Sequence, residues 1–192
     1  MALMASLIVL ALQSTAFQSP HWKEGSVVRV WTDTSMAPEG ASALVERAMK
    51  TWTDAARGRL TLTRAPSRAE AAVRVLFVAS DSVYGETAPR IDPATRSIVA
   101  ADVAINAGAG TDSLESRIIL YLTALHELGH AIGLQHTDDF RDIMYSFRRS
   151  TDGPRYFGAY RERLHSPEDI GSPAATGLSA ADVAALHALY GR

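Results

Sequence analysis

One short run, residues 126–136, contains most of the side chains that could do chemistry. Its spacing is H-E-x-x-H-x-x-G-x-x-H, with histidines at 126, 130 and 136. An α-helix turns about 100° per residue, so His126 and His130 lie about 40° apart on one face. Their imidazoles can therefore reach one metal ion from successive turns.

His136 cannot join this pair on a continuing helix, because it would stand about 15 Å along the axis from His126. A Zn–N bond is only about 2.0–2.1 Å long. The helix must therefore end and the chain must fold back, and Gly133 stands where that break is needed. Three imidazole nitrogens leave one tetrahedral position for water, which indicates a catalytic zinc site. We expect one zinc ion, with His126, His130 and His136 as ligands.

Glu127 projects about 100° away from His126, beside the metal. A carboxylate there can take a proton from an activated water and pass it to a leaving amine. The spacing is the long form of a zinc metallopeptidase motif. In a chain this long the five positions should coincide by accident with a probability on the order of 10⁻⁵. We expect Glu127 to be the catalytic residue.

These residues resemble the active-site helix of the metzincins, and most closely that of their matrixin branch. Downstream, Asp142-Ile143-Met144-Tyr145 resembles the Met-turn of that family, and residues 177–191 are similar to its closing helix. The resemblance covers residues 22–192. It implies structural support from Gly133, Met144, Tyr145 and Asp182. Met144 would form a hydrophobic floor, and Asp182 would brace the Met-turn or merely cap its helix.

The fold class that the resemblance implies is α+β, a metzincin-like zincin fold. It has a twisted, mostly parallel five-stranded sheet with one antiparallel edge strand, and three main helices. The sequence pattern agrees: alternation and β-branched residues predict strands, and apolar spacing predicts helices. A capping-box pattern, Asp112 with Glu115, is expected to begin the zinc helix. Strands are predicted at 26–32, 60–64, 71–79, 83–87 and 97–106, and helices at 41–56, from 112 to about 134, and after Ser179.

Composition suits one globular domain: 192 residues, 47% hydrophobic, and a net charge of −2. This charge gives no reason to expect nucleic-acid binding. The chain has no cysteine, so no thiol can block a metal ion. Matrixin pro-segments use a cysteine for that purpose. The partner we expect is a protein or peptide substrate held along the edge strand, and we expect a monomer.

Residues 1–12 are apolar but too few to span a bilayer, and Ser14-Thr15-Ala16 would suit signal peptidase. We therefore predict a signal peptide at 1–16, a catalytic domain at 17–192, secretion, and no stable membrane span. A buried N-terminal helix is the alternative, since no Lys or Arg precedes Lys23. If the segment after cleavage inhibits the enzyme, His21 is the residue that could block the metal.

Several other residues are weighed and set aside. Residues 23–125 contain no histidine, so we expect no second, structural zinc site, and His165 and His187 are not expected to be ligands. Calcium is conceivable but unsupported by any EF-hand-like spacing. Residues 146–176 either border the cleft with their arginines or form a surface loop of mixed charge; we favour the loop. The carboxylates that could contribute to calcium binding are Asp102, Asp112, Asp138 and Asp139.

Two other functions remain open at this stage. A zinc-dependent ribonuclease of the H-x3-H-x5-H type shares the histidine spacing, but it lacks the glutamate that follows the first histidine here. A catalytically silent binding domain could keep the fold without activity. The sequence favours a zinc-dependent endopeptidase, because Glu127 and all three histidines are present.

Overall fold

The computed structural model describes residues 19–80, 84–108 and 110–191. The predicted signal peptide at 1–16 lies outside these residues. Five strands form one sheet in the order β2-β1-β3-β5-β4, in which β4 pairs antiparallel with β5 and every other pair is parallel. This confirms the predicted fold class. The strands are β1 (Ser26–Thr32), β2 (Leu60–Arg64), β3 (Val73–Val78), β4 (Gly85–Ile91) and β5 (Ile98–Asn106).

Of the five strands, the antiparallel edge strand β4 differs most from its predicted range, which was 83–87. It continues to Ile91, past Pro89, and keeps its pairing with β5 through Ala88 and Pro89. Proline lacks a backbone N–H and is tolerated at a sheet edge, where one side of the strand needs no partner. The proline therefore ended the predicted strand too early. Val83 lies outside the described residues.

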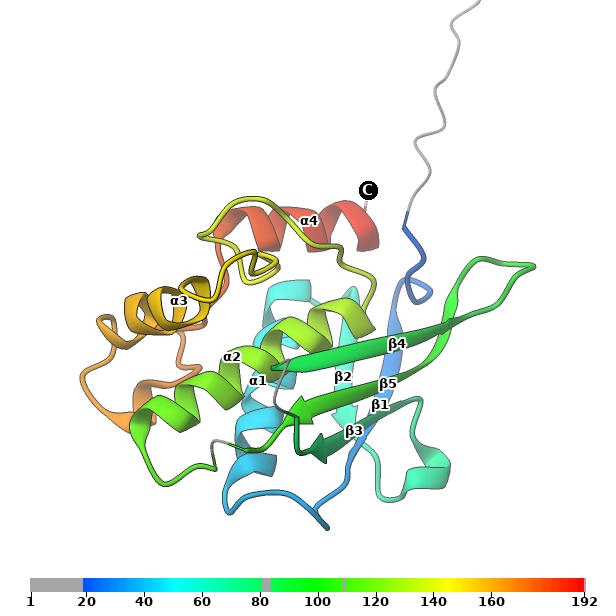
Figure 1. Cartoon of the computed structure of the whole chain (residues 1–192). Coiled ribbons are helices and arrows are strands. Elements are labelled where there is room, and N and C mark those ends of the chain that lie inside the picture. The colour runs from blue at the N-terminus through cyan, green and yellow to red at the C-terminus, as the bar shows by residue number, and fades with distance from the viewer. Residues whose placement is uncertain (1–18, 81–83, 109, 192) are drawn as a thin grey trace, which may run out of the picture.

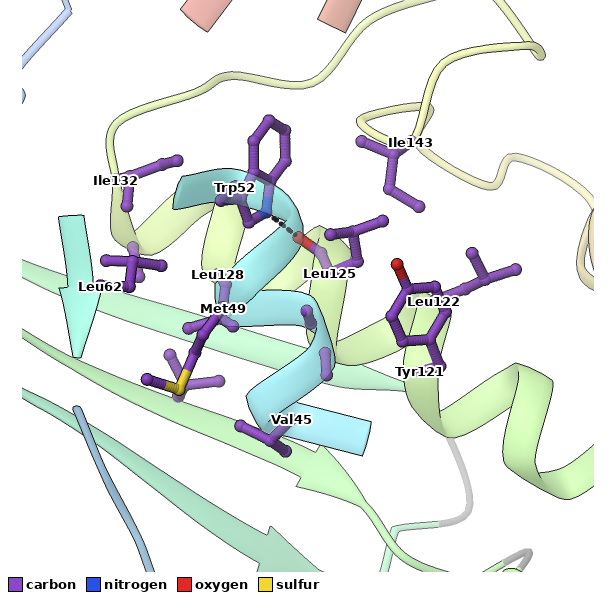
Figure 2. Packing of buried hydrophobic residues seen from close by; sticks show 14 of the residues in the cluster. Val45, Met49, Trp52, Leu62, Tyr121, Leu122, Leu125, Leu128, Ile132 and Ile143 are labelled. Atoms are coloured by element: carbon purple, nitrogen blue, oxygen red, sulfur yellow. Dashed lines mark hydrogen bonds between the residues drawn. The ribbon is translucent and has the colours of Figure 1, made fainter. Parts of the chain in front are cut away.

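Two long helices, α1 (Ala41–Ala56) and α2 (Leu114–Ala131), contact each other and pack on the sheet, α1 against β2 and α2 against β4 and β5 (Figure 1). Apolar side chains from both helices fill the space between them. The Trp52 indole N–H donates to the carbonyl oxygen of Leu125 at 2.8 Å, across that interface (Figure 2). A buried indole N–H needs such a partner, so this bond fixes α1 against the middle of α2.

Helix α2 begins one residue away from the predicted capping box. Ser113 is the N-cap, and its hydroxyl accepts from the backbone N–H of Ser116 at 3.0 Å. The predicted pairing of Asp112 with Glu115 is therefore wrong. Serine and aspartate are about equally good N-caps, so sequence alone does not choose between neighbours. Helix α4 (Ala180–Tyr190) does begin with the expected capping box of Ser179 and Asp182.

Residues 146–176 are not the surface loop we favoured. They contain a helix, α3 (Asp152–Arg161), and a short 3₁₀ turn, Pro167–Asp169. Helix α3 has two glycines and a proline in ten residues, a composition with weak helix propensity. Burial of Phe157 and Tyr160 overrides that weakness. Helix α3 contacts α2 (Figure 1).

The first described residues are fixed at the end of α2. The Trp22 indole N–H donates to the Ala131 carbonyl at 2.9 Å, and its backbone N–H donates to the Tyr190 hydroxyl. That hydroxyl in turn donates to the Ile132 carbonyl at 2.6 Å. Both ends of the described chain therefore contact the point where the zinc-motif helix stops.

Candidate active site

Gly133 allows the chain to reverse after α2. The helix ends at Ala131, three residues before the predicted Leu134, and Gly133 has φ of 101°. A side chain there would be strained, because this region of φ favours glycine. A Cβ would also lie 2.5 Å from the carbonyl oxygen of Pro20. The position therefore requires glycine both for its backbone angle and for its close contact.

The reversal brings the three histidines together. Nε2 of His136 lies 3.2 Å from Nε2 of His126 and 3.0 Å from Nε2 of His130. Among the described residues, these three form the one group of His, Cys, Asp or Glu side chains with the proximity needed to share a metal ion. The structure therefore places the predicted ligands at one point.

Two backbone carbonyls determine which ring nitrogens carry protons. Nδ1 of His126 lies 2.6 Å from the Ile143 carbonyl oxygen, and Nδ1 of His130 lies 2.9 Å from that of Leu134. A carbonyl only accepts, so each Nδ1 carries the proton and each Nε2 presents its lone pair. Toward Nε2 of His136, the Nε2 atoms of His126 and His130 therefore present lone pairs and no proton.

This donor set fits zinc. Lone pairs about 3 Å apart repel one another unless they share a cation, and two nitrogens on a tetrahedral zinc ion are roughly 3.3 Å apart for normal Zn–N bonds. The Nδ1–H to carbonyl contacts are the outer hydrogen bonds that orient histidine ligands. Burial, helped by the neighbouring histidines, lowers the pKa of His126 to about 4. Burial also lowers the pKa of His130, so both rings stay neutral, as metal ligation requires.

Glu127 is buried at the base of the cleft. Its Oε2 accepts from the Thr87 hydroxyl at 2.7 Å, and the same hydroxyl lies 3.0 Å from the Glu127 carbonyl oxygen. Burial raises the pKa of this carboxyl to about 7, with Glu86 adding to the rise and the Thr87 hydrogen bond opposing it. Glu127 lines the same pocket, of about 410 Å³, as His126 and His136. A buried carboxylate beside a metal site can exchange protons near neutral pH.

Comparison of the sequence with known proteins shows its family. The model of the matrixin family, Peptidase M10, matches residues 26–156. The chain belongs to the matrixins. It is 30% identical to mouse stromelysin-1 over 154 residues, which are 74% of this chain and 31% of the mouse protein. Rat stromelysin-1 matches to the same extent, so the chain spans about a third of the length of these relatives.

Met144 lies against the zinc-motif helix of this matrixin. It is buried, and a Cβ built on Gly129 would lie 2.5 Å from its Sδ and 3.2 Å from Trp52. The helix therefore approaches the Met-turn closely because residue 129 has no side chain. Ile143, the residue before Met144, accepts the Nδ1–H of His126, so the turn also orients a predicted ligand.

Tyr145 lines the pocket, but its hydroxyl donates to the Asp152 carboxylate at 3.2 Å. The same oxygen of Asp152 accepts from the backbone N–H groups of Arg148 and Arg149, at 2.8 and 3.1 Å. These contacts lower the pKa of Asp152, the Arg148 N–H first. Tyr145 thus contacts the start of α3, and its hydroxyl is occupied there.

Asp182 both caps α4 and braces the Met-turn. Its Oδ2 accepts from the Ser179 N–H at 2.8 Å and from the Ile143 N–H at 2.9 Å. The two roles weighed from the sequence are therefore performed together by one oxygen. Burial raises the pKa of this carboxyl despite those hydrogen bonds, and Asp142 contributes to the rise.

The wall of the pocket opposite α2 comes from the segment expected to be a loop. Phe147, Tyr156 and Phe157 line it, and Tyr84 meets Phe147 and Phe157 edge-on from the β4 side, with ring centroids 5.8 and 5.1 Å apart. Of the arginines in this segment, Arg149 lines the pocket, whereas Arg148 contacts Asp138 on the surface. The wall is therefore mainly aromatic.

The residues weighed as other metal ligands have other contacts. Asp102 pairs with Arg74 at 2.9 Å and Asp139 with Arg141 at 2.6 Å. His187 Nε2 lies 2.8 Å from the Ala55 carbonyl, and His21 packs edge-on against Tyr190 at the C-terminal end of α2. None of these groups belongs to the histidine cluster among the described residues.

Sequence reasoning missed Thr87 and Gly85. Both lie on β4, and a Cβ on Gly85 would lie 2.7 Å from Cγ of Glu127. A threonine and a glycine two residues apart, in a strand predicted beside the cleft, would place both on the same face. The strand's position next to α2 was expected only by resemblance, and no pattern in the sequence pairs Thr87 with Glu127.

Proposed function

We propose that this matrixin domain is a zinc-dependent endopeptidase that cleaves peptide bonds with Glu127 as the general base and acid. The observation that carries the proposal is the convergence of three imidazole Nε2 atoms, two of them from residues that line one pocket with the buried carboxylate of Glu127. His126, His130 and His136 would hold zinc. When bound, the ion would lower the pKa of a water molecule and polarise the scissile carbonyl.

The chain's own residues supply the remaining steps. Glu127 takes the proton of the attacking water and later gives it to the leaving amine, so that the peptide bond breaks with protons balanced. Strand β4 ends the sheet and lies beside the pocket. An extended peptide can add to such an edge through main-chain hydrogen bonds. The aromatic wall then receives one of its side chains.

The sequence adds an export signal, a substrate class and an oligomeric state to the proposal. Residues 1–16 would direct export, and a single folded domain would act on protein or peptide substrates as a monomer. None of the helices in the described ranges combines the length and hydropathy of a bilayer-spanning segment. The family match gives no support to the ribonuclease alternative.

The test is a peptide library incubated with purified protein, with products identified by mass spectrometry. We expect internal cleavage that stops when a zinc chelator is added and returns with zinc. The Glu127→Ala variant should bind the same amount of zinc and lose most of the cleavage. Wild-type protein that contains zinc but cleaves no peptide would instead support the silent binding domain.

A further inference from the structure

We infer that Thr87 is a positioning residue, which anchors one oxygen of Glu127 and leaves the other to exchange the proton. The inference rests on the proposed role of Glu127. Thr87 is the residue whose hydroxyl contacts this carboxylate, at 2.7 Å from Oε2. Oε1 accepts no hydrogen bond from the residues that the structure describes. The two oxygens therefore have different surroundings.

The Thr87 hydroxyl has a single proton and two acceptors within reach. Oε2 of Glu127 is nearer than the carbonyl oxygen of Glu127, at 2.7 against 3.0 Å. A hydrogen bond to a carboxylate is also shorter and stronger than one to a neutral carbonyl. The proton is therefore directed mainly to Oε2, and this oxygen becomes the anchored one.

The rest of β4 makes this anchor rigid. Thr87 pairs with Val103 of β5 in the antiparallel register, and a β-branched side chain on a strand has few rotamers available. Gly85, on the same face, comes so close that a Cβ would lie 2.7 Å from Cγ and 2.9 Å from Oε1 of Glu127. Gly85 thus gives the carboxylate its space, and Thr87 fixes its orientation within that space.

Loss of this anchor should affect the chemical step more than substrate binding. Glu127 would rotate among orientations, and misplacement of a reacting group by about 1 Å can cost on the order of 100-fold in rate. For Thr87→Val, which keeps the shape and removes the hydroxyl, we expect kcat to fall between roughly 5- and 100-fold, with KM within about twofold. Zinc content should be unchanged, because among the described residues the Thr87 hydroxyl makes no hydrogen bond to a histidine.

Thr87→Ser keeps the hydroxyl and should restore kcat to within about threefold of wild type. Thr63→Val is the matched control, because Thr63 lies on β2, the opposite edge of the same sheet. It should leave kcat and KM unchanged. If Thr87→Val does not fold, as judged by circular dichroism, Thr87→Ala removes the same hydroxyl without adding a methyl group.

The decisive measurement combines Thr87→Val with Glu127→Ala. If Thr87 acts through Glu127, the double variant should turn over at the same residual rate as Glu127→Ala alone. If Thr87→Val lowers the rate of Glu127→Ala by the same factor as it lowers the wild-type rate, Thr87 has a general structural role and the inference is overturned. A wild-type kcat for Thr87→Val would also overturn it. A fully active Glu127→Ala variant would instead overturn the proposed function itself.

Discussion

Helix α2 and the segment that follows it, residues 136–157, both build the cleft, but their side chains are held in different ways. In α2 the spacing of the residues along one helix places His126, Glu127 and His130. In the following segment, single hydrogen bonds from distant residues fix the backbone: Asp182 holds the Ile143 N–H, and the Tyr156 hydroxyl donates to the Asp142 carbonyl at 3.0 Å. Substitutions of these three α2 residues should therefore remove function, and most substitutions in the following segment, His136 excepted, should only modulate stability.

The largest expected effect is that of His130→Ala. One of three ligands is lost, so zinc content should fall well below one per chain and activity should drop on the order of 10³-fold or more. Elemental analysis and peptide turnover are the measurements. Tyr145→Phe is the comparison from the following segment; it should keep full zinc content, because within the described residues the Tyr145 hydroxyl hydrogen-bonds to Asp152 and to no histidine. Undiminished zinc in His130→Ala would contradict the ligand assignment.

Glu127→Gln should come next. Glutamine keeps the size of the side chain and an oxygen that can accept from Thr87, but it cannot take a proton from water. Removal of a general acid–base group typically costs 10²–10⁴-fold, and we expect kcat to fall within that range with zinc retained. Turnover within a few-fold of wild type would mean that another group is the base.

Gly129→Ala tests the contact between the two regions. Its Cβ would lie 2.5 Å from Met144 Sδ, so Met144 or the helix must move, and overpacking of this kind typically costs about 1–3 kcal/mol. We expect a lower free energy of unfolding in urea. The control is Gly158→Ala on α3, where a Cβ meets nothing within 4 Å. That change should stabilise the protein by up to about 1 kcal/mol, because alanine favours a helix. Equal effects at the two positions would contradict the packing argument.

Asp182→Asn should have the smallest effect and should show itself as a change in pH dependence. The pKa of Asp182 is raised in the folded state by burial and by Asp142. As the pH rises above 3.8, the ordinary value, the unfolded chain ionises first. The contribution of Asp182 to the unfolding free energy of the wild type therefore falls as the pH rises, until the pH passes the raised pKa of the folded state. Above that pH the contribution stays constant. The asparagine side chain of the variant does not titrate, so the difference between the two unfolding free energies should change in this window alone. An equal difference between the two unfolding free energies at all pH values would contradict this link between stability and the ionisation of Asp182.

The difference between α2 and residues 136–157 also explains which features could be predicted from the sequence. Helix periodicity placed His126 and His130, and the need for a reversal at Gly133 placed His136, because all of these depend on residues close in sequence. The mostly parallel sheet with its antiparallel edge strand, and the Met-turn, came from resemblance. Helix α3 was missed because its glycines and proline disfavour a helix locally, and its burial depends on partners elsewhere in the chain. The contact of Thr87 with Glu127 joins residues 40 apart in sequence, and it appears only when α2 lies beside β4.

Trp22 and Tyr190 have a consequence for protein engineering. Their hydrogen bond brings the beginning and the end of the described fold side by side at the close of α2. Circular permutation succeeds most readily when a short linker can join the natural ends and new ends open at an exposed loop. A linker between residues near Trp22 and Tyr190 would add a covalent connection parallel to an existing contact. New ends in the turn between β4 and β5, where Asp92, Ala94 and Thr95 lie, would be at the opposite end of β4 from Gly85, which lines the pocket.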